Sequence, residues 1–400
     1  MKSEWNTYTV QQLIDMGMIE PPMDGNHGAI HPKTSDYVSN GIPFIMANDL
    51  INGKVNFKSC AFITETQAAT LRKGFAKPGD VLLTHKATIG RTAIVPDNYK
   101  TIILTPQVTY YRVIKGLNRR YLRYYFDSNK FQQLFSNWAG AGSTRAYLGI
   151  TAQHKLPIIV PPIEIQNVIA DICGSLDDKI ELNNKINENL ERQARSIFYN
   201  RFINIDTVPV GWKKGNLLDI ANYLNGLAMQ KFRPQGDEVG LPVLKIKELR
   251  QGSCDSGSEL CSPNIKSEYI IQDGDVVFSW SGSLLVDIWC GGTCGLNQHL
   301  FKVTSDTYDK WFYYLWTTHH LDRFIAVAAD KATTMGHIKR GELAKAEVLI
   351  PTEEDYKKIS ALMNPIFELI IANRIESRKL SELRDALLPK LMNGELRVDY

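Results

Sequence analysis

Polar and basic side chains that could hydrogen-bond to nucleic acid bases gather in Gly- and Pro-marked segments of the first half of this 400-residue chain. Arginine and lysine suit guanine, asparagine and glutamine suit adenine, and serine or threonine can serve either base. The segments are MDGNHGAIHPK (23–33), THKATIGR (84–91) and GAGSTRAYL (140–148). The candidate DNA-binding residues of this half are Asn26, His27, His31, Lys33, Lys86, Thr88, Arg91, Ser143, Thr144, Arg145 and Tyr147.

Similar segments occur in the second half, namely NGLAMQKFRP (225–234), SWSGS (279–283), LNQHL (296–300) and DKATTMGHIKR (330–340). The candidate DNA-binding residues here are Gln230, Lys231, Arg233, Ser279, Ser281, Ser283, Asn297, Gln298, His299, Lys331, Thr333, Thr334, His337 and Lys339. For each of these residues taken alone, the alternative to a DNA contact is that it is an ordinary solvent-exposed loop residue.

Catalytic groups are hard to find in the sequence. FSNWAGAGS (135–143) resembles a methyl-donor loop only superficially, because it is expected to follow a helix and not a strand. Neither an N-P-P-[FY] motif nor a G-x-x-x-x-G-K-[ST] phosphate loop occurs. Asp171, Asp177, Asp178 and Lys179 follow the order of a nuclease metal site, but we expect them on the solvated flank of a helix. We therefore expect a chain that is not an enzyme, has no catalytic residues and binds no cofactor itself.

The six cysteines form no regular disulfide framework, which favours a reduced, cytoplasmic protein. Cys254, Cys261, Cys290 and Cys294 depart from common zinc spacings, so we expect no metal site. No run of about 18 apolar residues predicts a membrane span. The N-terminal residues lack the apolar core of a secretory signal.

Positive charge is concentrated in residues 1–158, which hold 18 lysines and arginines against 10 aspartates and glutamates. Residues 159–204 and 205–350 each carry a net charge of −2, and residues 351–400 carry −1. A basic excess is typical of a polyanion partner, although it also serves solubility. DNA contacts of the second half would have to rely on local clusters of charge.

The sequence patterns of two segments predict long helices, each with a narrow apolar stripe. SLDDKIELNNKINENLERQARSIFYN (175–200) has no Gly or Pro and is rich in straight-chain residues. It aligns with residues 358–391 at an offset of 190, and the matched positions repeat every seven residues, the coiled-coil period. The predicted helix-pairing residues are Ile169, Leu176, Asn183, Leu190 and Ile197, matched by Ile359, Ile366, Asn373, Leu380 and Leu387.

The repeat continues outside these helices. KLPIIVPP (155–162) matches KAEVLIPT (345–352), FAKPGDVLLTHKATIG (75–90) matches IIQDGDVVFSWSGSLL (270–285), and GIPFIMANDL (41–50) matches GLPVLKIKEL (240–249). An aromatic-rich segment also occurs twice, at 118–136 and 308–326, and we expect its rings in the core. These matches predict an α+β chain of two similar mixed α/β domains, each followed by a long helix.

The helical segments resemble one family specifically. PPIEIQNVIADICGSLDDKIELNNKINENLERQARSIFYNRF (161–202) and SELRDALLPKLMNGEL (381–396) are similar to the helical regions of the specificity subunits of type I restriction–modification enzymes. The resemblance covers the whole chain. It implies target-recognition domains at 1–158 and 205–350, and helical spacers at 159–204 and 351–400. It also implies a long antiparallel two-helix coiled coil that separates the domains, with a pseudo-twofold internal repeat.

The resemblance further implies that each recognition domain reads one half of a split, asymmetric double-stranded DNA target. The helices would set the spacing and dock two modification subunits. S-adenosylmethionine would bind to those methyltransferase subunits, and ATP and Mg²⁺ to restriction subunits. Two alternatives stay open: a scaffold whose twin domains bind protein, and a recognition subunit that serves a methyltransferase without a restriction partner.

Overall fold

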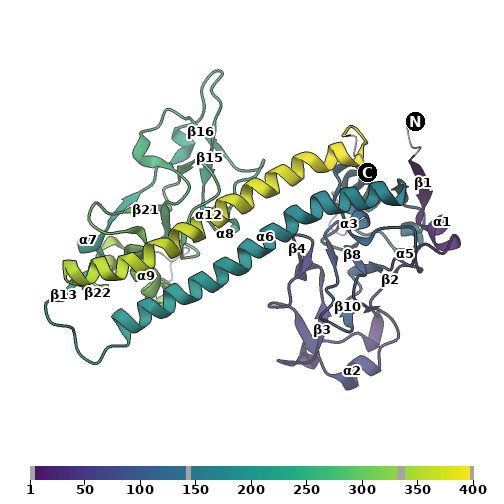
Figure 1. The fold of residues 1–400 in the computed structure, drawn as a ribbon, viewed down its shortest axis with the longest axis horizontal. Helices are drawn as coiled ribbons and strands as arrows, with labels where there is room; N and C mark the ends of the chain where they lie inside the picture. The colour runs from purple at the N-terminus through teal and green to yellow at the C-terminus, as the bar shows by residue number, and fades with distance from the viewer. Residues whose placement is uncertain (1–4, 141–145, 331–337, 397–400) are drawn as a thin grey trace. The chain divides into compact units, whose positions relative to one another are not determined.

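The computed structural model describes residues 5–140, 146–330 and 338–396 (Figure 1). The chain divides into two compact units. Unit 1 comprises Met1–Asp178 and Glu382–Tyr400, and unit 2 comprises Lys179–Ser381. Each unit therefore contains one α/β body together with parts of two long helices, α6 (Ile163–Phe198) and α12 (Glu353–Met392).

The body of unit 1 is built from short strands and helices. Its strands are β1 (Asn6–Thr9), β2 (Met23–Asp24), β3 (Ile42–Ile45), β4 (Leu50–Ile51), β5 (Lys54–Val55), β6 (Ala61–Ile63), β7 (Phe75–Ala76), β8 (Val81–Thr84), β9 (Thr92–Ile94), β10 (Ile102–Leu104), β11 (Val108–Tyr111) and β12 (Pro157–Val160). Its helices are α1 (Val10–Asp15), α2 (Glu65–Ala69), α3 (Arg119–Asp127), α4 (Asn129–Trp138) and α5 (Ile150–Gln153), with the short turns η1 (Gly28–Ile30), η2 (Thr34–Asp36) and η3 (Ala47–Asp49).

The body of unit 2 has a matching set of elements. Its strands are β13 (Lys213–Asn216), β14 (Asn222–Asn225), β15 (Leu241–Leu244), β16 (Leu260–Cys261), β17 (Ile270–Ile271), β18 (Val276–Ser279), β19 (Leu285–Ile288), β20 (Cys294–Leu296), β21 (Leu300–Thr304) and β22 (Glu347–Ile350). Its helices are α7 (Leu217–Ile220), α8 (Ile246–Gln251), α9 (Lys310–His319), α10 (Leu321–Asp330) and α11 (Arg340–Ala344), with the short segments η4 (Tyr199–Ile203), η5 (Met229–Lys231) and η6 (Ser267–Tyr269).

Apart from the two-stranded sheet β4-β5 that unit 1 has in addition, the two bodies share the topology of their sheets. The sheet of order β6-β3-β10-β7 in unit 1 corresponds to β16-β15-β20-β17 in unit 2, and β2-β11-β8-β9 corresponds to β14-β21-β18-β19. A further two-stranded sheet pairs β1 with β12, as β13 pairs with β22. Asp80 and its counterpart Asp275 each pair with a cation, Arg112 and Lys302 respectively, although these two cations stand at different register positions of β21 and of the chain after β11. The predicted α+β fold class with an internal repeat is confirmed.

Aromatic residues of the repeated helical segment lie in the cores, as predicted. Trp311, Phe312 and Trp316 of α9 are buried in unit 2, and Tyr121 and Phe126 of α3 are buried in unit 1. The side chain of Asn118 caps α3 by accepting hydrogen bonds from the first free backbone N–H groups of the helix. Along the described ranges, no helix has the length and apolar character needed to cross a membrane.

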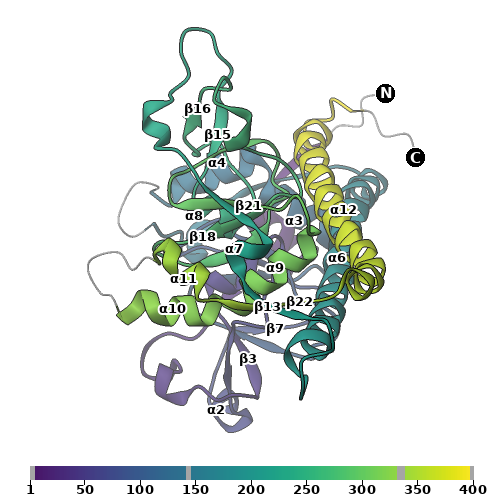
Figure 2. The same cartoon turned by 90° about the vertical axis from the view of Figure 1, so that its left-hand side faces the viewer.

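Helices α6 and α12 run antiparallel in unit 2, where they lie side by side in both views (Figures 1 and 2). Asn183 Nδ2 lies 3.4 Å from the Ser377 hydroxyl oxygen, and Asn373 Nδ2 donates to Asn187 Oδ1 at 2.9 Å. Residues 187 and 377 match at the same 190-residue offset as 183 and 373, so the two contacts are related by exchange of the helices. Asn183 and Asn373, the matched asparagines among the predicted helix-pairing residues, therefore each face the other helix.

The other predicted helix-pairing residues differ in burial. Ile169 and Ile359 are buried, and Asn183 and Asn373 are buried with them. The half-buried ones are Leu176, Leu190, Ile197, Ile366, Leu380 and Leu387. The predicted seven-residue repeat of pairing residues therefore describes the contacts between the two helices only approximately, since much of each helix packs against a body.

Each body packs on parts of both helices. In unit 1, Ile169 and Cys173 of α6 join Leu388 and Leu391 of α12 in one core. In unit 2, Ala194 and Phe198 of α6 join Ile359, Met363 and Phe367 of α12. The division into compact units therefore cuts both helices, whereas the predicted four segments keep each helix whole, and those boundaries stay a prediction.

Candidate nucleic-acid interface

The loops that follow β8 and β18 are repeat-equivalent strand tips. In unit 1, His85 accepts a backbone hydrogen bond from the N–H of Leu148 at 3.0 Å, and in unit 2, Trp280 accepts one from Ile338 at 3.1 Å. Tip 1 denotes Asp24, His27, Lys73, His85, Lys86 and Tyr147, and tip 2 denotes Asn225, Trp280, Ser281 and His299. The two tips occupy the same place in the two copies of the fold.

A glycine brings a neighbouring strand close to each tip. A Cβ atom at Gly25 would overlap the carbonyl oxygen of Leu104, and one at Gly226 would overlap the carbonyl oxygens of Leu296 and Asn297. Only glycine allows so close an approach of two backbones. The residues before these glycines, Asp24 and Asn225, are thereby fixed at equivalent places.

Tip 1 is organised around the carboxylate of Asp24, which is only 3% exposed. Lys73 Nζ forms an ion pair with Oδ1, and His27 Nε2 lies 2.7 Å from Oδ2. His85 is fully buried, with Nδ1 hydrogen-bonded to the carbonyl of Leu148 and Nε2 4.0 Å from Asp24 Oδ2. A buried acid thus holds two partly exposed nitrogen-bearing side chains.

The same environment shifts two pKa values at tip 1. Burial by itself raises the pKa of Asp24, but the hydrogen bonds and charges of Lys73 and His27 outweigh it, so the pKa is lowered overall. Burial lowers the pKa of His85, and the charge of Asp24 opposes this only in part. The chemical consequence is an ionised Asp24 beside a neutral His85 at neutral pH.

The outer face of tip 1 pairs a cation with an aromatic ring. Lys86 and Tyr147 form an antiparallel bridge, and Lys86 Nζ lies 6.0 Å from the centre of the Tyr147 ring. Tyr147 is 49% exposed, which is unusual for a ring of this size. An exposed ring can stack on a base, and an exposed ammonium can contact a phosphate.

Tip 2 has the same frame with different side chains. Asn225 takes the place of Asp24, and Trp280 takes the place of His85. Trp280 Nε1 donates to Asn225 Oδ1 at 3.0 Å, and the side chain of Asn225 is exposed. Nearby, the Ser281 hydroxyl lies 3.0 Å from His299 Nδ1. Tip 2 therefore presents a neutral amide where tip 1 presents a buried acid with its cation.

The candidate residues named from the sequence fall into groups by exposure. The exposed ones are His27, Lys33, Lys86, Arg91, Tyr147, Gln230, Lys231, Arg233, Ser283 and Lys339. The half-buried ones are His31, Thr88, Gln298 and His299. Ser143, Thr144, Arg145, Lys331, Thr333, Thr334 and His337 lie outside the described residues.

The remaining four candidates are buried and serve the fold. Asn26 Oδ1 accepts from the backbone N–H groups of Arg72 and Lys73, and Asn297 Oδ1 accepts from that of His299. Ser279 donates to a neighbouring loop carbonyl, and Ser281 is 5% exposed. We propose no direct DNA contact for these four, because their polar groups are engaged or covered, and Ser281 belongs to tip 2 only as the hydrogen-bonding neighbour of His299.

The structure brings together few of the candidates directly. Lys86 meets Tyr147, and Ser281 meets His299, whereas the exposed Arg233 pairs with Glu259. Sequence reasoning missed Asp24, Lys73, His85, Asn225 and Trp280. The match of 75–90 to 270–285 already placed His85 opposite Trp280, and that substitution at a repeated polar tip was the available signal.

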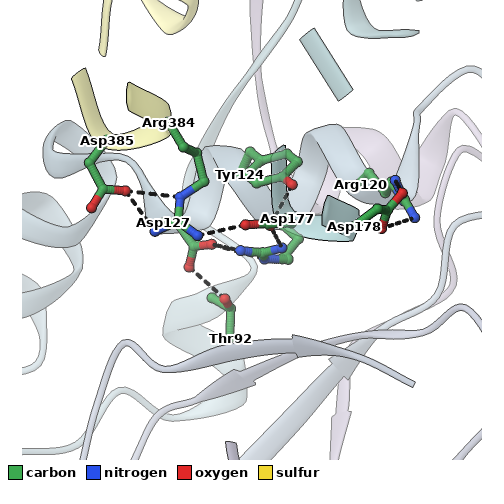
Figure 3. A network of polar contacts seen from close by, with 9 residues as sticks. Thr92, Arg120, Tyr124, Asp127, Asp177, Asp178, Arg384 and Asp385 are labelled. Carbon is green, nitrogen blue, oxygen red and sulfur yellow. Dashed lines mark hydrogen bonds and ion pairs between the residues drawn. The ribbon is translucent and has the colours of Figure 1, made fainter. Parts of the chain in front are cut away.

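A second polar region of unit 1 lies at the end of α12 (Figure 3). A cavity of about 480 Å³ is lined by Arg91, Arg123, Arg384, Asp127 and Asp385, among others. Arg123 pairs with Asp127 and Asp177, and Arg384 pairs with Asp177 and Asp385. Its buried arginines are thus neutralised by carboxylates, which is typical of a structural ion-pair network.

This network corrects one expectation. Asp177 does not lie on a solvated flank of the helix, because its side chain is only 11% exposed and bonds to Arg123, Arg384 and the hydroxyl of Tyr124. The expectation was wrong because it considered α6 alone, while α3 and α12 both pack against this position in unit 1. Its neighbour Asp178 does pair at the surface, with Arg120.

Within the described ranges, no group of three or more His, Cys, Asp or Glu side chains is placed to hold a metal ion. All six cysteines are free thiols.

Comparison with known proteins gives one family. The model of the type I restriction modification DNA specificity domain matches residues 2–192 and again 209–383. The chain is 28% identical over 423 residues to the type I restriction enzyme MjaIX specificity subunit of Methanocaldococcus jannaschii, covering 98% of this chain and 94% of the relative. It is 22% identical over 442 residues to the HindI specificity subunit of Haemophilus influenzae, covering 89% and 94%.

Among solved structures, the S subunit of a type I restriction-modification system from M. genitalium matches with a TM-score of 0.56. The identity is 13%, and the match covers 98% of this chain and 96% of the other. At this identity, the likeness concerns the fold.

Proposed function

The chain belongs to the family of type I restriction modification DNA specificity domains, and from this premise we propose that its two units read the two halves of a split, asymmetric DNA target. Each body would dock on double-stranded DNA by its own strand tip. Base edges would supply sequence information, and phosphates would supply most of the affinity.

The observation that carries this proposal is one fold with two different tips. Topology and backbone contacts repeat between the units, while Asp24 and His85 of tip 1 are replaced by Asn225 and Trp280 of tip 2. A repeated scaffold with changed side chains is what an asymmetric two-part target requires. A scaffold that binds two copies of one protein would favour like surfaces.

The long helices would set the spacing between the half-sites. With 36 and 40 residues, α6 and α12 would each span roughly 54–60 Å at about 1.5 Å per residue. Equivalent major-groove sites on one face of DNA recur every ~34–36 Å. Helices of this length suffice to place two readers in successive grooves.

The same helices would also dock the partner subunits. Leu182, Leu369 and Leu383 are exposed apolar side chains on α6 and α12. We propose that modification subunits cover such positions and bring S-adenosylmethionine to the DNA, and that restriction subunits bring ATP and Mg²⁺. This chain would supply no catalytic group.

Mapping modified adenines in host DNA, with and without this gene, tests the proposal. We expect a two-part motif whose methylation disappears when the gene is deleted and returns when it is supplied in trans. An unchanged methylation map, in cells that express the modification subunit, would overturn the proposal.

A second measurement separates a DNA reader from a protein scaffold. The affinity of the purified complex for a duplex with the mapped motif should fall steeply with salt, since each neutralised phosphate contributes to the salt dependence. A duplex with a scrambled motif should bind much more weakly. Equal binding of both duplexes would contradict sequence reading.

A further inference from the structure

We propose that the side chains at positions 24 and 225 set the base preference of the two half-sites: tip 1 takes guanine through Lys73 held by Asp24, and tip 2 takes adenine through Asn225. The inference rests on the proposed function and adds the residues and the base classes. None of the residues involved lies outside the described ranges.

The two positions are structural equivalents. Asp24 pairs with Thr109 of β11, and Asn225 pairs with Phe301 of β21, at corresponding registers of corresponding sheets. Each precedes a glycine that is pressed against the neighbouring backbone. Each faces the first residue of the tip loop, since His85 Nε2 lies 4.0 Å from the Asp24 carboxylate and Trp280 Nε1 lies 3.0 Å from Asn225 Oδ1. A change of side chain here changes the chemistry without changing the frame.

At tip 1, the donor that we propose as the reader is the partly exposed Lys73. Its ammonium group is ion-paired with the buried Asp24, and its side chain is 35% exposed. An ammonium has three N–H donors and no acceptor, so donors remain for a ligand after one is used by Asp24. The major-groove edge of guanine offers two acceptors, O6 and N7, whereas adenine offers N7 beside an N–H donor. A fixed lysine therefore favours guanine.

At tip 2, the reader is an amide whose orientation is set. The indole N–H of tryptophan can only donate, so the atom of Asn225 that it contacts is the oxygen. The Nδ2 group then faces away from Trp280, and Oδ1 keeps a second lone pair. Donation to adenine N7 and acceptance from its N6–H group is the usual pairing of asparagine with adenine.

Variants of the full chain, expressed with its partner subunits in cells that lack the chromosomal copy, test the assignment. In Lys73→Met, we expect a guanine position of one half-site to relax, with methylation at substituted sites rising at least tenfold. In Asn225→Leu, an adenine position of the other half-site should relax instead. Lys73→Arg should keep the guanine, because arginine also pairs with its O6 and N7 atoms.

Matched controls lie close to each of the two positions. Lys77 is an exposed lysine close in sequence to Lys73, and Asn222 is an exposed asparagine at the other end of β14. Lys77→Met and Asn222→Leu should leave the motif unchanged. Asp24→Asn tests the positioning role of Asp24 and should relax the same guanine position as Lys73→Met, with the rest of the motif retained.

The outcomes separate the two proposals. A methylation map with the wild-type motif in both Lys73→Met and Asn225→Leu would overturn this inference and leave the proposed function standing. Loss of gene-dependent methylation in the wild type itself would overturn the proposed function. If a variant loses all methylation, the base assignment is tested with the purified wild-type complex. Its affinity is measured for duplexes that carry 7-deazaguanine or 7-deazaadenine at the mapped positions. Each should weaken binding at least tenfold, and unchanged binding would contradict the assignment.

Discussion

At the scale of single residues, the same helix position carries opposite chemistry in the two units. Asp177 of α6 and Phe367 of α12 match at the 190-residue offset, as do Tyr124 and Tyr314. Tyr124 donates to Asp177 at 2.6 Å, whereas Tyr314 packs edge-on against Phe367 with 5.7 Å between ring centres. At this position, the helix of unit 1 contacts its body through buried charge, and the helix of unit 2 contacts its body through apolar packing.

The buried charges of unit 1 make a sharp stability test. Arg123→Met would leave Asp127 without its guanidinium partner and Asp177 with one partner fewer, in surroundings where the Arg123 side chain is only 10% exposed. Removing one member of a buried ionic network costs on the order of 3 kcal/mol. We expect a loss of this size in the free energy of unfolding, measured by urea denaturation with a probe in unit 1.

The control for Arg123→Met is a surface pair from the same two helices. Arg120 and Asp178 are 44% and 56% exposed, and such pairs contribute about 0–1 kcal/mol. Arg120→Met should therefore change stability little. Equal losses in the two variants would contradict a special role for the buried network.

His85 predicts a pH dependence of the stability of unit 1. Burial holds the pKa of His85 below its usual value near 6.5, although Asp24 opposes the shift and His27 and Lys86 reinforce it. The folded state therefore prefers neutral His85. Neutral His85 contributes fully to the stability of the folded state above the pKa of the unfolded state. This contribution is lost as the pH falls below 6.5 towards the pKa of the folded state.

We expect the free energy of unfolding of the wild type to fall between pH 7 and pH 5, and the fall to be smaller in His85→Gln. The pKa values of His31, His319 and His320 are also lowered by burial, but these residues remain in the variant and cancel in the difference. Thermal unfolding at closely spaced pH values measures this difference. Parallel curves for wild type and variant would exclude the role of His85.

At the scale of elements, the local sequence pattern predicted much more of the fold than of the site. The pattern of a strand such as Val81–Thr84 and the heptad pattern of the helices can be recognised from the neighbouring residues alone. Because each pattern occurs in both halves, each copy supports the prediction made from the other. The tips are assembled differently, because Asp24 at the end of β2 lies far in the chain from both Lys73, which precedes β7, and His85. Only sheet pairing brings these residues together, so no local pattern could show it.

Some polar loop residues have a structural role that the sequence does not distinguish from DNA binding. Asn26 and Asn297 have the composition expected of readers of bases, yet each uses its side-chain oxygen to satisfy backbone N–H groups of nearby loops. Asparagine is frequent in loops for this purpose as well. Burial separates the two roles, and burial of a loop depends on tertiary packing.

The helix pair offers a test at the scale of elements. Asn187 and Asn373 are buried between α6 and α12, and Asn187 Nδ2 also donates to the carbonyl of Ile370 at 3.1 Å. Asn373→Leu should cost about 1–3 kcal/mol, because the oxygen of Asn187 would lose its partner in a buried place. In the double variant Asn187→Leu/Asn373→Leu, most of this loss should be recovered.

A double-mutant cycle in urea measures the coupling between the two asparagines. Asn184→Leu, at an exposed position of the same helix, is the control and should change stability little. Additive losses in the double variant would show that the asparagines act independently. A double variant that is stable but pairs its helices in several registers would support a role of the amides in specificity of pairing.

At the scale of the whole molecule, α12, like α6, contributes to both compact units. Residues Glu353–Ser381 of α12 belong to unit 2, and the remainder of the helix belongs to unit 1. The C-terminal turns bring Leu388, Leu391 and Met392 into the core of unit 1, each no more than 7% exposed. The last part of the sequence therefore completes the first unit.

Truncation after Ser381 should consequently damage unit 1 and spare unit 2. It removes three buried apolar side chains, each contributing about 1.5–3 kcal/mol, together with Arg384, a partner of Asp177. We expect faster amide hydrogen exchange in α3 and in the first half of α6, with α9 and β18 keeping their protection. Truncation after Leu396 retains these contacts and should match the full chain. If α9 and β18 lost protection to the same extent as α3, the assignment of the C-terminal turns to the core of unit 1 would fail.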